Sequence, residues 1–87
     1  MKFYEVLKKL DEGEITKARR MSWERDDYIY IQNGSVIKPD DARNDVLKNE
    51  DKDIVILPHI DKILNNGIAI IGWSPTSEDM LSSDWEI

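Results

Sequence analysis

The first thirteen residues alternate apolar and charged positions with the period of an α-helix. Phe3, Val6, Leu7 and Leu10 are spaced i, i+3, i+4 and i+7, which gives one apolar stripe along the helix. Gly13 follows the last of them, and glycine enters the left-handed conformation that ends a helix at no steric cost. The pattern predicts a short amphipathic helix that lies on a sheet.

Short stretches with alternating character then predict strands. Residues 15–20 are a first candidate, and in residues 28–31 tyrosines alternate with isoleucines, so the two residue types face opposite sides. The Asn-Gly pair at 33–34 tolerates the positive φ of a type I′ turn. We therefore expect residues 35–37 to return as the paired strand and to stop at Pro39, which cannot donate to a ladder.

The middle of the chain is dense in charge and poor in apolar residues. The sequence predicts a loop at residues 40–53, with one helical turn at 42–47. The apolar run at 54–57 and the alternating run at 59–64 then predict strands. An Asn-Asn-Gly sequence at 65–67 predicts a second hairpin turn.

The last twenty residues predict a strand, a helix and a final strand. Residues 68–73 form the most hydrophobic candidate strand, so we expect it at the centre of the sheet. The Ser-Pro pair at 74–75 predicts a helix start, with serine as N-cap and proline in the first turn. Met80 and Leu81 should pack inward from that helix, and residues 84–87 should form a last short strand.

Taken in order, these elements predict an α+β fold. We expect a small antiparallel sheet of about five strands, an N-terminal helix and a short C-terminal helix before the last strand. The 87 residues make a single domain, 1–87. A chain this short buries only about 60–65% of its unfolded surface, and it contains no cysteine for a disulfide. We therefore expect a homo-oligomer.

The net charge of −6 narrows the classes of partner. An acidic chain is repelled by phosphate backbones, so we expect no nucleic-acid partner. The acidity suits solubility, or an inhibitor that covers a basic surface on another protein. No apolar run approaches the roughly 20 residues of a membrane span, and the charged N-terminus is unlike a signal peptide. We expect no membrane partner.

No catalytic motif is present in the sequence, and we expect no enzyme activity, no metal and no cofactor. The single histidine, His59, precedes Asp61 by two residues. On a strand both side chains point to the same face, so they can share a proton or hold a polar ligand. Two side chains are too few for a zinc site. The alternative is a structural, hydrogen-bonded histidine.

The aromatic residues and the arginines suggest two further interpretations. The tryptophans and two tyrosines lie beside predicted turns or strand ends, at Trp23, Tyr28, Tyr30, Trp73 and Trp85. They either close the ends of a thin core or form a wall on which a nucleobase stacks, which contributes about 1–3 kcal/mol per base. The densest basic patch lies beside Trp23 and consists of Lys17, Arg19, Arg20 and Arg25. Three neighbouring acids partly cancel its charge.

Several segments, in a fixed order, are similar to one known family. They are the helix that ends at Gly13, Arg20–Trp23, Tyr28–Tyr30, Pro58–Asp61, Asn66-Gly67, Trp73–Leu81 and Ser83–Ile87. This arrangement resembles the small phage proteins of the second Thoeris anti-defence type. The distance from Gly13 to Arg20 is slightly longer than in that pattern, and residues 39–53 have no counterpart in it.

The resemblance implies a sponge that does not cleave its ligand. Such proteins are homo-oligomers, typically tetramers, in the cytoplasm of the infected bacterial host. They hold a cyclic ADP-ribose isomer, the glycocyclic form, in pockets between subunits, so that the host effector is not activated. Some members also bind cyclic dinucleotides.

The resemblance and the residues together give a hypothesis for the ligand site. Adenine would stack on an aromatic side chain, arginine would neutralise the diphosphate, and aspartate would accept hydrogen bonds from ribose hydroxyls. The candidate ligand-binding residues are Arg20 (assisted by Arg19), Trp23, Tyr28, His59, Asp61, Trp73 and Asp84. The rival hypotheses are an enzyme that cleaves the same signal with His59 as acid or base, and an acidic protein–protein inhibitor.

Overall fold

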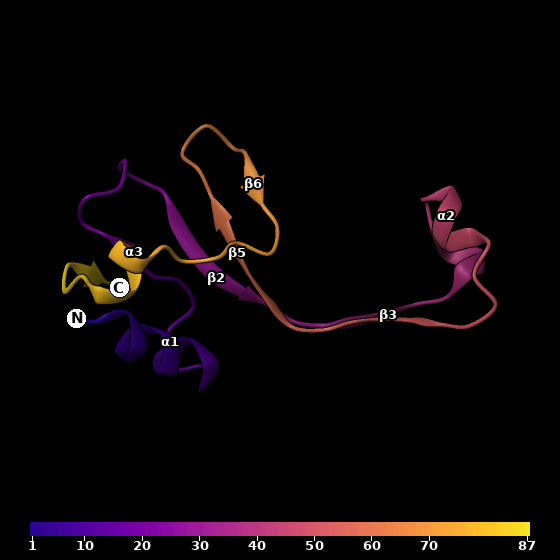
Figure 1. Cartoon of the computed structure of the whole chain (residues 1–87), viewed down its shortest axis with the longest axis horizontal. Helices are drawn as coiled ribbons and strands as arrows, with labels where there is room; N and C mark the ends of the chain where they lie inside the picture. The colour runs from indigo at the N-terminus through magenta and orange to yellow at the C-terminus, as the bar shows by residue number, and fades with distance from the viewer.

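The computed structural model describes residues 1–87 and divides them into a body and an arm (Figure 1). The body contains residues 1–32 and 59–87, and the arm contains residues 33–58. The molecule measures 46 × 28 × 22 Å because the arm projects from one end of the body. The elements are α1 (Phe3–Asp11), β1 (Arg19–Arg20), β2 (Tyr28–Gln32), β3 (Ser35–Ile37), η1 (Pro39–Asp41), α2 (Asp45–Lys48), β4 (Ile54–Ile56), β5 (His59–Ile63), β6 (Ala69–Ile70), α3 (Ser77–Leu81) and β7 (Trp85–Glu86).

The predicted α+β class is confirmed, and the strands are divided among three antiparallel sheets. Strands β2, β5 and β6 form one sheet, in that order. Strands β3 and β4 pair in the arm, and β1 pairs with β7 beside the two ends of the chain. The predicted N-terminal helix, the short helix near the C-terminus and the final strand are all present.

Helix α1 closes the core of the body. Its apolar stripe buries Phe3, Val6 and Leu10, as the spacing predicted. These side chains pack with Ile29 of β2 and Trp85 of β7, which are 0% and 2% exposed. Since the core joins the first helix to the last strand, both ends of the chain are needed to form it.

The prediction that residues 28–31 and 35–37 pair as a hairpin is wrong. β2 instead pairs with β5, with Gln32 opposite His59, and β3 pairs with β4. Gly34 explains the difference. A Cβ atom there would lie 2.3 Å from the carbonyl oxygen of Ile56 and 3.1 Å from Cδ of Pro58. The glycine is required where two nearly continuous strands pass closely, so the chain runs straight on into the arm instead of turning.

The second predicted hairpin is confirmed, but its position in the sheet is not. Strand β6 pairs with β5 across the turn, and the Leu64 amide donates to the Ile68 carbonyl at 2.8 Å. The expectation that residues 68–73 are central is wrong, because β5 occupies the centre and β6 the edge. Ile68, Ile70 and Ile71 are exposed there.

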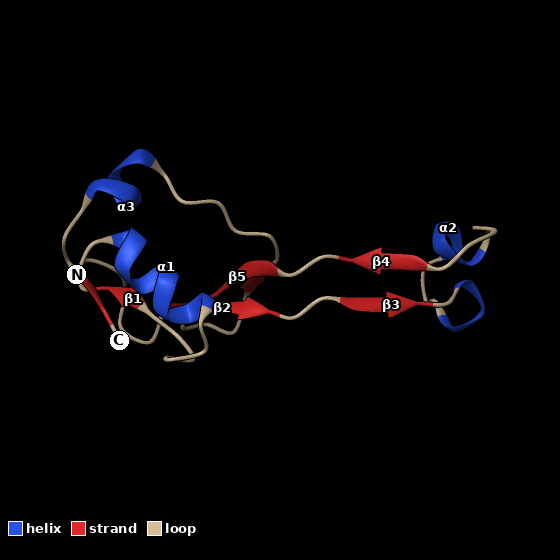
Figure 2. Ribbon diagram, turned by 90° about the horizontal axis from the view of Figure 1, so that it is seen from below, coloured by secondary structure: helices blue, strands red, loops and turns tan.

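The tip of the arm carries the helical turn expected in the charged middle segment. The 3₁₀ helix η1 and helix α2 lie at the far end of the arm (Figure 2). The Asn44 side chain accepts from the Val46 amide at 2.8 Å and so caps α2. Helix α1, with nine residues, is the longest helix, and no helix has the length and hydropathy needed to cross a membrane.

Helix α3 begins two residues later than predicted. Thr76, not Ser74, is the N-cap: its hydroxyl accepts from the Asp79 amide, and the Asp79 carboxylate accepts from the Thr76 amide. The expectation that Met80 and Leu81 pack inward is also wrong, since both are exposed. The shift turns Asp79 to the buried side of the helix instead.

Candidate functional site

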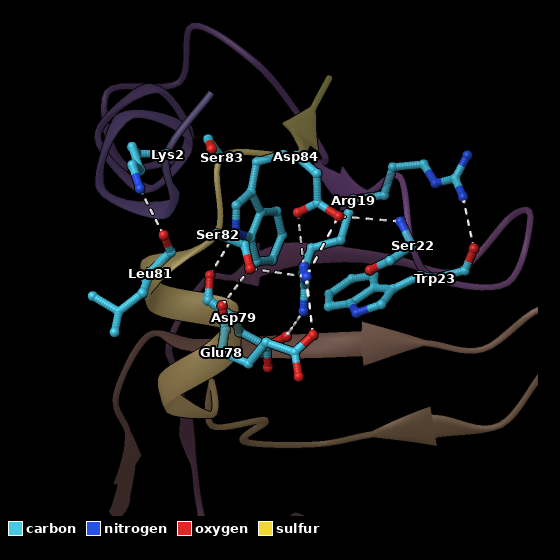
Figure 3. Close-up of polar contacts among 12 residues, drawn as sticks. Lys2, Arg19, Ser22, Trp23, Glu78, Asp79, Leu81, Ser82, Ser83 and Asp84 are labelled. Atoms are coloured by element: carbon cyan, nitrogen blue, oxygen red, sulfur yellow. Dashed lines mark hydrogen bonds and ion pairs between the residues drawn. The ribbon is translucent and has the colours of Figure 1, made fainter.

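Arg20 lies at the centre of a buried polar cluster, which we call the Arg20 network. Its guanidinium donates through Nε to Asp84 Oδ1 and through Nη1 to Asp79 Oδ1, each at 2.9 Å. Nη2 donates to the Ser82 hydroxyl at 3.0 Å and to Glu78 at 3.3 Å. Figure 3 shows how Glu78, Asp79, Ser82 and Asp84 converge from α3 and the segment that follows it. The network joins strand β1 to the C-terminal part of the chain.

The charges of the Arg20 network stabilise one another. Hydrogen bonding to Asp84 and Asp79 raises the pKa of Arg20, although burial alone would lower it. Burial alone would raise the pKa of Asp79, but hydrogen bonds from Thr76 and Arg20 outweigh it and lower that pKa. Hydrogen bonds from Arg20, and then from Ser22, lower the pKa of Asp84. The arginine and both aspartates are therefore charged at neutral pH.

In this arrangement Arg20 and Asp84 stabilise the fold. Arg20 is only 6% exposed, and each of its three guanidinium nitrogens already donates to a protein oxygen. Asp84 also accepts from the Ser22 amide at 3.3 Å (Figure 3). A diphosphate would have to displace three carboxylates to reach Arg20, so within one chain the guanidinium is committed to the fold.

The tryptophans form a cluster rather than an open wall. The Trp23 and Trp73 ring centroids are 5.8 Å apart, and each ring also packs on Trp85, at 5.0 and 6.5 Å. Lys62 Nζ lies 3.6 Å from the centroid of the Trp23 ring, a cation–π contact. Trp23 and Trp73 are half-buried, and Trp85 is buried. The cluster supports the interpretation of these residues as the closure of a thin core.

His59 and Asp61 meet, as their spacing predicted. His59 Nε2 lies 3.3 Å from Asp61 Oδ1, which also accepts from the Gly72 amide at 3.0 Å. The other ring nitrogen, Nδ1, lies 2.9 Å from the Leu57 carbonyl oxygen. Asp61 is fully buried, and its Oδ2 has no hydrogen-bond partner. The pair ties β5 to the segment after β6 at the base of the arm.

Two adjacent pockets share the lining residues Lys17 and Tyr28, and we call the two together the Tyr28 groove, each pocket being one half of it. One half has a volume of about 230 Å³ and gathers the cationic side chains; its lining is Lys17, Ala18, Arg19, Arg25, Asp26, Asp27, Tyr28 and Ile87. The other half has a volume of about 330 Å³ and is largely aromatic and apolar; its lining is Thr16, Lys17, Tyr28, Tyr30 and Ile63. Lys17 and Tyr28 belong to both halves.

The register of the sheet explains the aromatic half. Tyr28 stands opposite Ile63 across the β2–β5 ladder, and Tyr30 lies two residues further along the same face. The Tyr28 and Tyr30 ring centroids are 6.2 Å apart, and Lys17 Nζ lies 4.8 Å from the centroid of Tyr28. The isoleucine face of β2 is turned to the core, as the alternation predicted.

The cationic half contains donors that are not fully used within the chain. Lys17 and Arg25 are exposed. Arg19 donates to the Trp23 carbonyl at 3.1 Å and lies 3.4 Å from Glu86, but its Nε is buried and has no partner. Asp27 is occupied, because its Oδ1 accepts from the Asn65 amide at 2.8 Å. This half can therefore receive an anionic group.

The seven predicted site residues thus fall into four places. Arg20 and Asp84 are joined in the Arg20 network, and Trp23 and Trp73 are joined in the tryptophan cluster beside it. His59 and Asp61 form their own pair. Only Tyr28 lies in the groove where a ring face and three cationic side chains come together.

Two features of the site were not predicted from the sequence. The first is Asp79 as a partner of Arg20; the Thr-x-x-Asp capping pattern at 76–79 would have placed this aspartate on the helix correctly. The second is the separation of Arg20 from the rest of its basic patch. Adjacent residues on a strand face opposite sides, so Arg19 and Arg20 had to diverge.

Comparison with known proteins gives one family. The model of the Thoeris anti-defense 2-like domain matches residues 1–87. A search of curated proteins found no match.

Proposed function

Because the chain belongs to the Thoeris anti-defense 2-like family, we propose that it is a phage sponge that binds a cyclic ADP-ribose-type immune signal and does not cleave it. The family gives the chain its anti-defence role. The proposed ligand is the glycocyclic form of cyclic ADP-ribose, held in the cytoplasm of the infected host so that the Thoeris effector is not activated. The proposed assembly is a homotetramer.

The observation that carries the proposal is the composition of the Tyr28 groove. A nucleotide of this type combines one purine ring with a diphosphate. The groove combines the Tyr28 and Tyr30 rings in one half with Lys17, Arg19 and Arg25 in the other. The three cations of this half outnumber its two side-chain carboxylates, Asp26 and Asp27, so in an acidic chain of net charge −6 it offers the local positive charge that an anionic ligand requires.

We assign the ligand contacts from this geometry. The adenine ring stacks on Tyr28, one of the three aromatic candidates. Lys17 and Arg25, which are exposed, neutralise the diphosphate in place of Arg20, and the charge of Arg19 beside them assists. Trp23, Trp73, His59, Asp61 and Asp84 are proposed as contacts only of a ligand that bridges two copies.

A sponge acts stoichiometrically, so slow release matters more than turnover. Both halves of the groove are open to solvent on one side, and a second copy that covers them would exclude water from the phosphate contacts. Desolvation strengthens charge-assisted hydrogen bonds and lowers the dissociation rate. This is the physical reason to propose an oligomer around the ligand.

The test is capture followed by release. The protein is incubated with the purified signal, separated from free ligand, heat-denatured, and the supernatant is analysed by mass spectrometry. We expect intact signal. The double variant Lys17→Glu/Arg25→Glu should lower affinity at least 100-fold, because each lost charge-assisted hydrogen bond is worth about 1.5–3 kcal/mol. The matched control Arg43→Glu/Lys52→Glu reverses two exposed charges at the arm tip and should bind normally.

Each other result has a distinct meaning. A linear product in the supernatant would identify an enzyme and overturn the sponge. Capture of a host protein with no releasable nucleotide would identify an acidic protein–protein inhibitor. Equal capture by both double variants would keep the sponge but move the ligand away from the Tyr28 groove.

A further inference from the structure

The arm is a two-stranded ribbon (Figure 2). Its sequence places apolar side chains on both faces. Val36 stands directly opposite Val55, and Leu57 follows two positions later on the same face; we call these three residues the valine stripe. They are 62%, 65% and 73% exposed. The opposite face carries half-buried isoleucines, at Ile37, Ile54 and Ile56.

Such a ribbon is incomplete by itself. A sheet with one solvent face alternates apolar and polar residues, whereas residues 54–57 are apolar without interruption, as in strands covered on both sides. An isolated two-stranded hairpin is marginally stable in water at best. Residues 33–37 and 54–57 also contain no charged side chain of the kind that protects a free strand edge. The valine stripe therefore has the character of an interface.

The partner that fits best is a second copy of this chain. The exposed apolar side chains of the ribbon must be covered whenever the protein is folded, so the partner must always be available. A second copy of the chain meets this condition. An uncharged stripe also meets the requirements of two-fold symmetry, under which each interface residue of one copy meets the same surface on the other. A host protein would be available only part of the time.

The exposed area of the valine stripe indicates which surface of the second copy it contacts. Three side chains of this size contribute roughly 80 Å² each, or about 250 Å² per copy, whereas a stable interface needs roughly 800 Å² per partner and at least 1,000 Å² in total. Two arms packed only on each other are too small. The body offers a second apolar patch at the free edge of β6, where Ile68, Ile70 and Ile71 are 55%, 40% and 65% exposed. Residues 65–72 contain no charge.

We propose that two copies exchange arms: the valine stripe of each copy lies against the β6 edge of the other. Stripe and patch together supply roughly 500 Å² of side-chain surface per copy, and the main chain of the arm adds to it. The two copies together therefore bury about 1,000 Å², which is the lower limit for a specific interface. The contact names the surface that builds the oligomer of the proposed function, but it does not require the ligand.

The first test is the mass in solution without nucleotide, measured by light scattering after gel filtration. The wild type should have a multiple of 10.2 kDa, and Val36→Glu/Val55→Glu should return to 10.2 kDa. Both positions are exposed, but two glutamates directly opposite each other repel, so Val36→Glu/Val55→Lys, whose opposite charges attract across the ladder, should also be monomeric, and a urea titration should show that its fold is intact. Val46→Glu, at an equally exposed valine of α2, is the matched control and should keep the wild-type mass. A monomeric wild type, or an unchanged mass for the double variant, would overturn the proposal.

The second test fixes the register of the exchange. The chain has no cysteine, so Val55→Cys and Ile71→Cys can be made as separate clean variants. Under mild oxidation the mixture of the two should form a disulfide-linked dimer, and each variant alone should not. Efficient cross-linking of Val55→Cys with itself would show arms packed on arms and would overturn the exchange. Neither test contains the signal nucleotide, so failure here leaves the sponge hypothesis to its own experiment.

Discussion

Replacing Arg20 by alanine should remove a large fraction of the free energy of unfolding. Arg20→Ala removes the partner of Asp79, whose side chain is only 10% exposed, and of Asp84, at 28%. Removing one member of a buried ion pair costs about 3–5 kcal/mol because the other charge stays behind, desolvated. The pair with Glu78, 76% exposed, adds little. For 87 residues the total stability is roughly 4–13 kcal/mol, so the loss is a large fraction of it.

Urea unfolding followed by tryptophan fluorescence measures the effect. With a slope of about 1–1.5 kcal/mol/M for a small protein, Arg20→Ala should lower the midpoint by about 2–5 M. Arg19→Ala is the matched control, because it removes the neighbouring arginine of β1. Its ion pair with Glu86 is long, at 3.4 Å, and partly exposed, so it should cost about 1 kcal/mol or less. Arg20→Lys should fall between them, since one ammonium group cannot bridge Asp79 and Asp84 in the same way.

The comparison also separates a structural role from a ligand-binding role. If Arg20 holds the fold, ligand capture by Arg20→Ala should fall only in proportion to the folded fraction. The reasoning is refuted if Arg20→Ala is no less stable than Arg19→Ala. A variant that stays folded but no longer captures the signal would instead restore Arg20 to the ligand site.

Three further predictions concern stability. Gly34→Ala should destabilise the base of the arm, because its Cβ would lie 2.3 Å from a backbone carbonyl oxygen. The control Gly13→Ala meets no atom within 4 Å and should cost only about 1–2 kcal/mol, from the strain of its left-handed backbone. Hydrogen exchange of the arm amides would distinguish a local effect from a global one. His59→Ala should cost about 1–3 kcal/mol, because it removes the imidazole that lies 3.3 Å from the buried Asp61 carboxylate, and much less in an Asp61→Asn background; equal costs in both backgrounds would contradict the pairing. Hydrogen bonds lower the pKa of both aspartates of the Arg20 network, so near the ordinary aspartate pKa of about 3.9 the folded chain binds fewer protons than the unfolded chain. This contribution to stability should be complete above about pH 5 and decline as the pH falls, and urea midpoints that do not change between pH 5 and pH 3 would exclude it.

Periodicity was sufficient for elements whose stability is local. The apolar stripe of α1 and the tyrosine–isoleucine alternation of β2 were both confirmed. In each case one face of the element is buried by the core, so the pattern in the sequence records the burial directly. The second hairpin was also local, because its turn needs only an Asn-Gly sequence and a few adjacent residues.

Pairing over long distances was not predictable in the same way. The Asn-Gly sequence at 33–34 satisfies a turn as well as a crossing, and only the approach of residues 56–58 decides between them. Arg20 illustrates the same limit for the site. Its sequence neighbours suggested a basic patch, but its partners lie 58 to 64 residues away. The contacts that assign its role come entirely from the tertiary structure.

The separation of body and arm has a consequence for how the chain can vary. Gln32 and His59 are direct partners in the β2–β5 ladder, so residues 33–58 form a loop that begins and ends at adjacent points of the body. The entropy of closing such a loop changes slowly, by about 0.6 kcal/mol for each doubling of its length. Insertions and deletions in the arm should therefore leave the body nearly unaffected. The length of the arm beyond the valine stripe, at residues 38–53, is therefore a nearly independent evolutionary variable, whereas the core and the Tyr28 groove stay under a separate constraint.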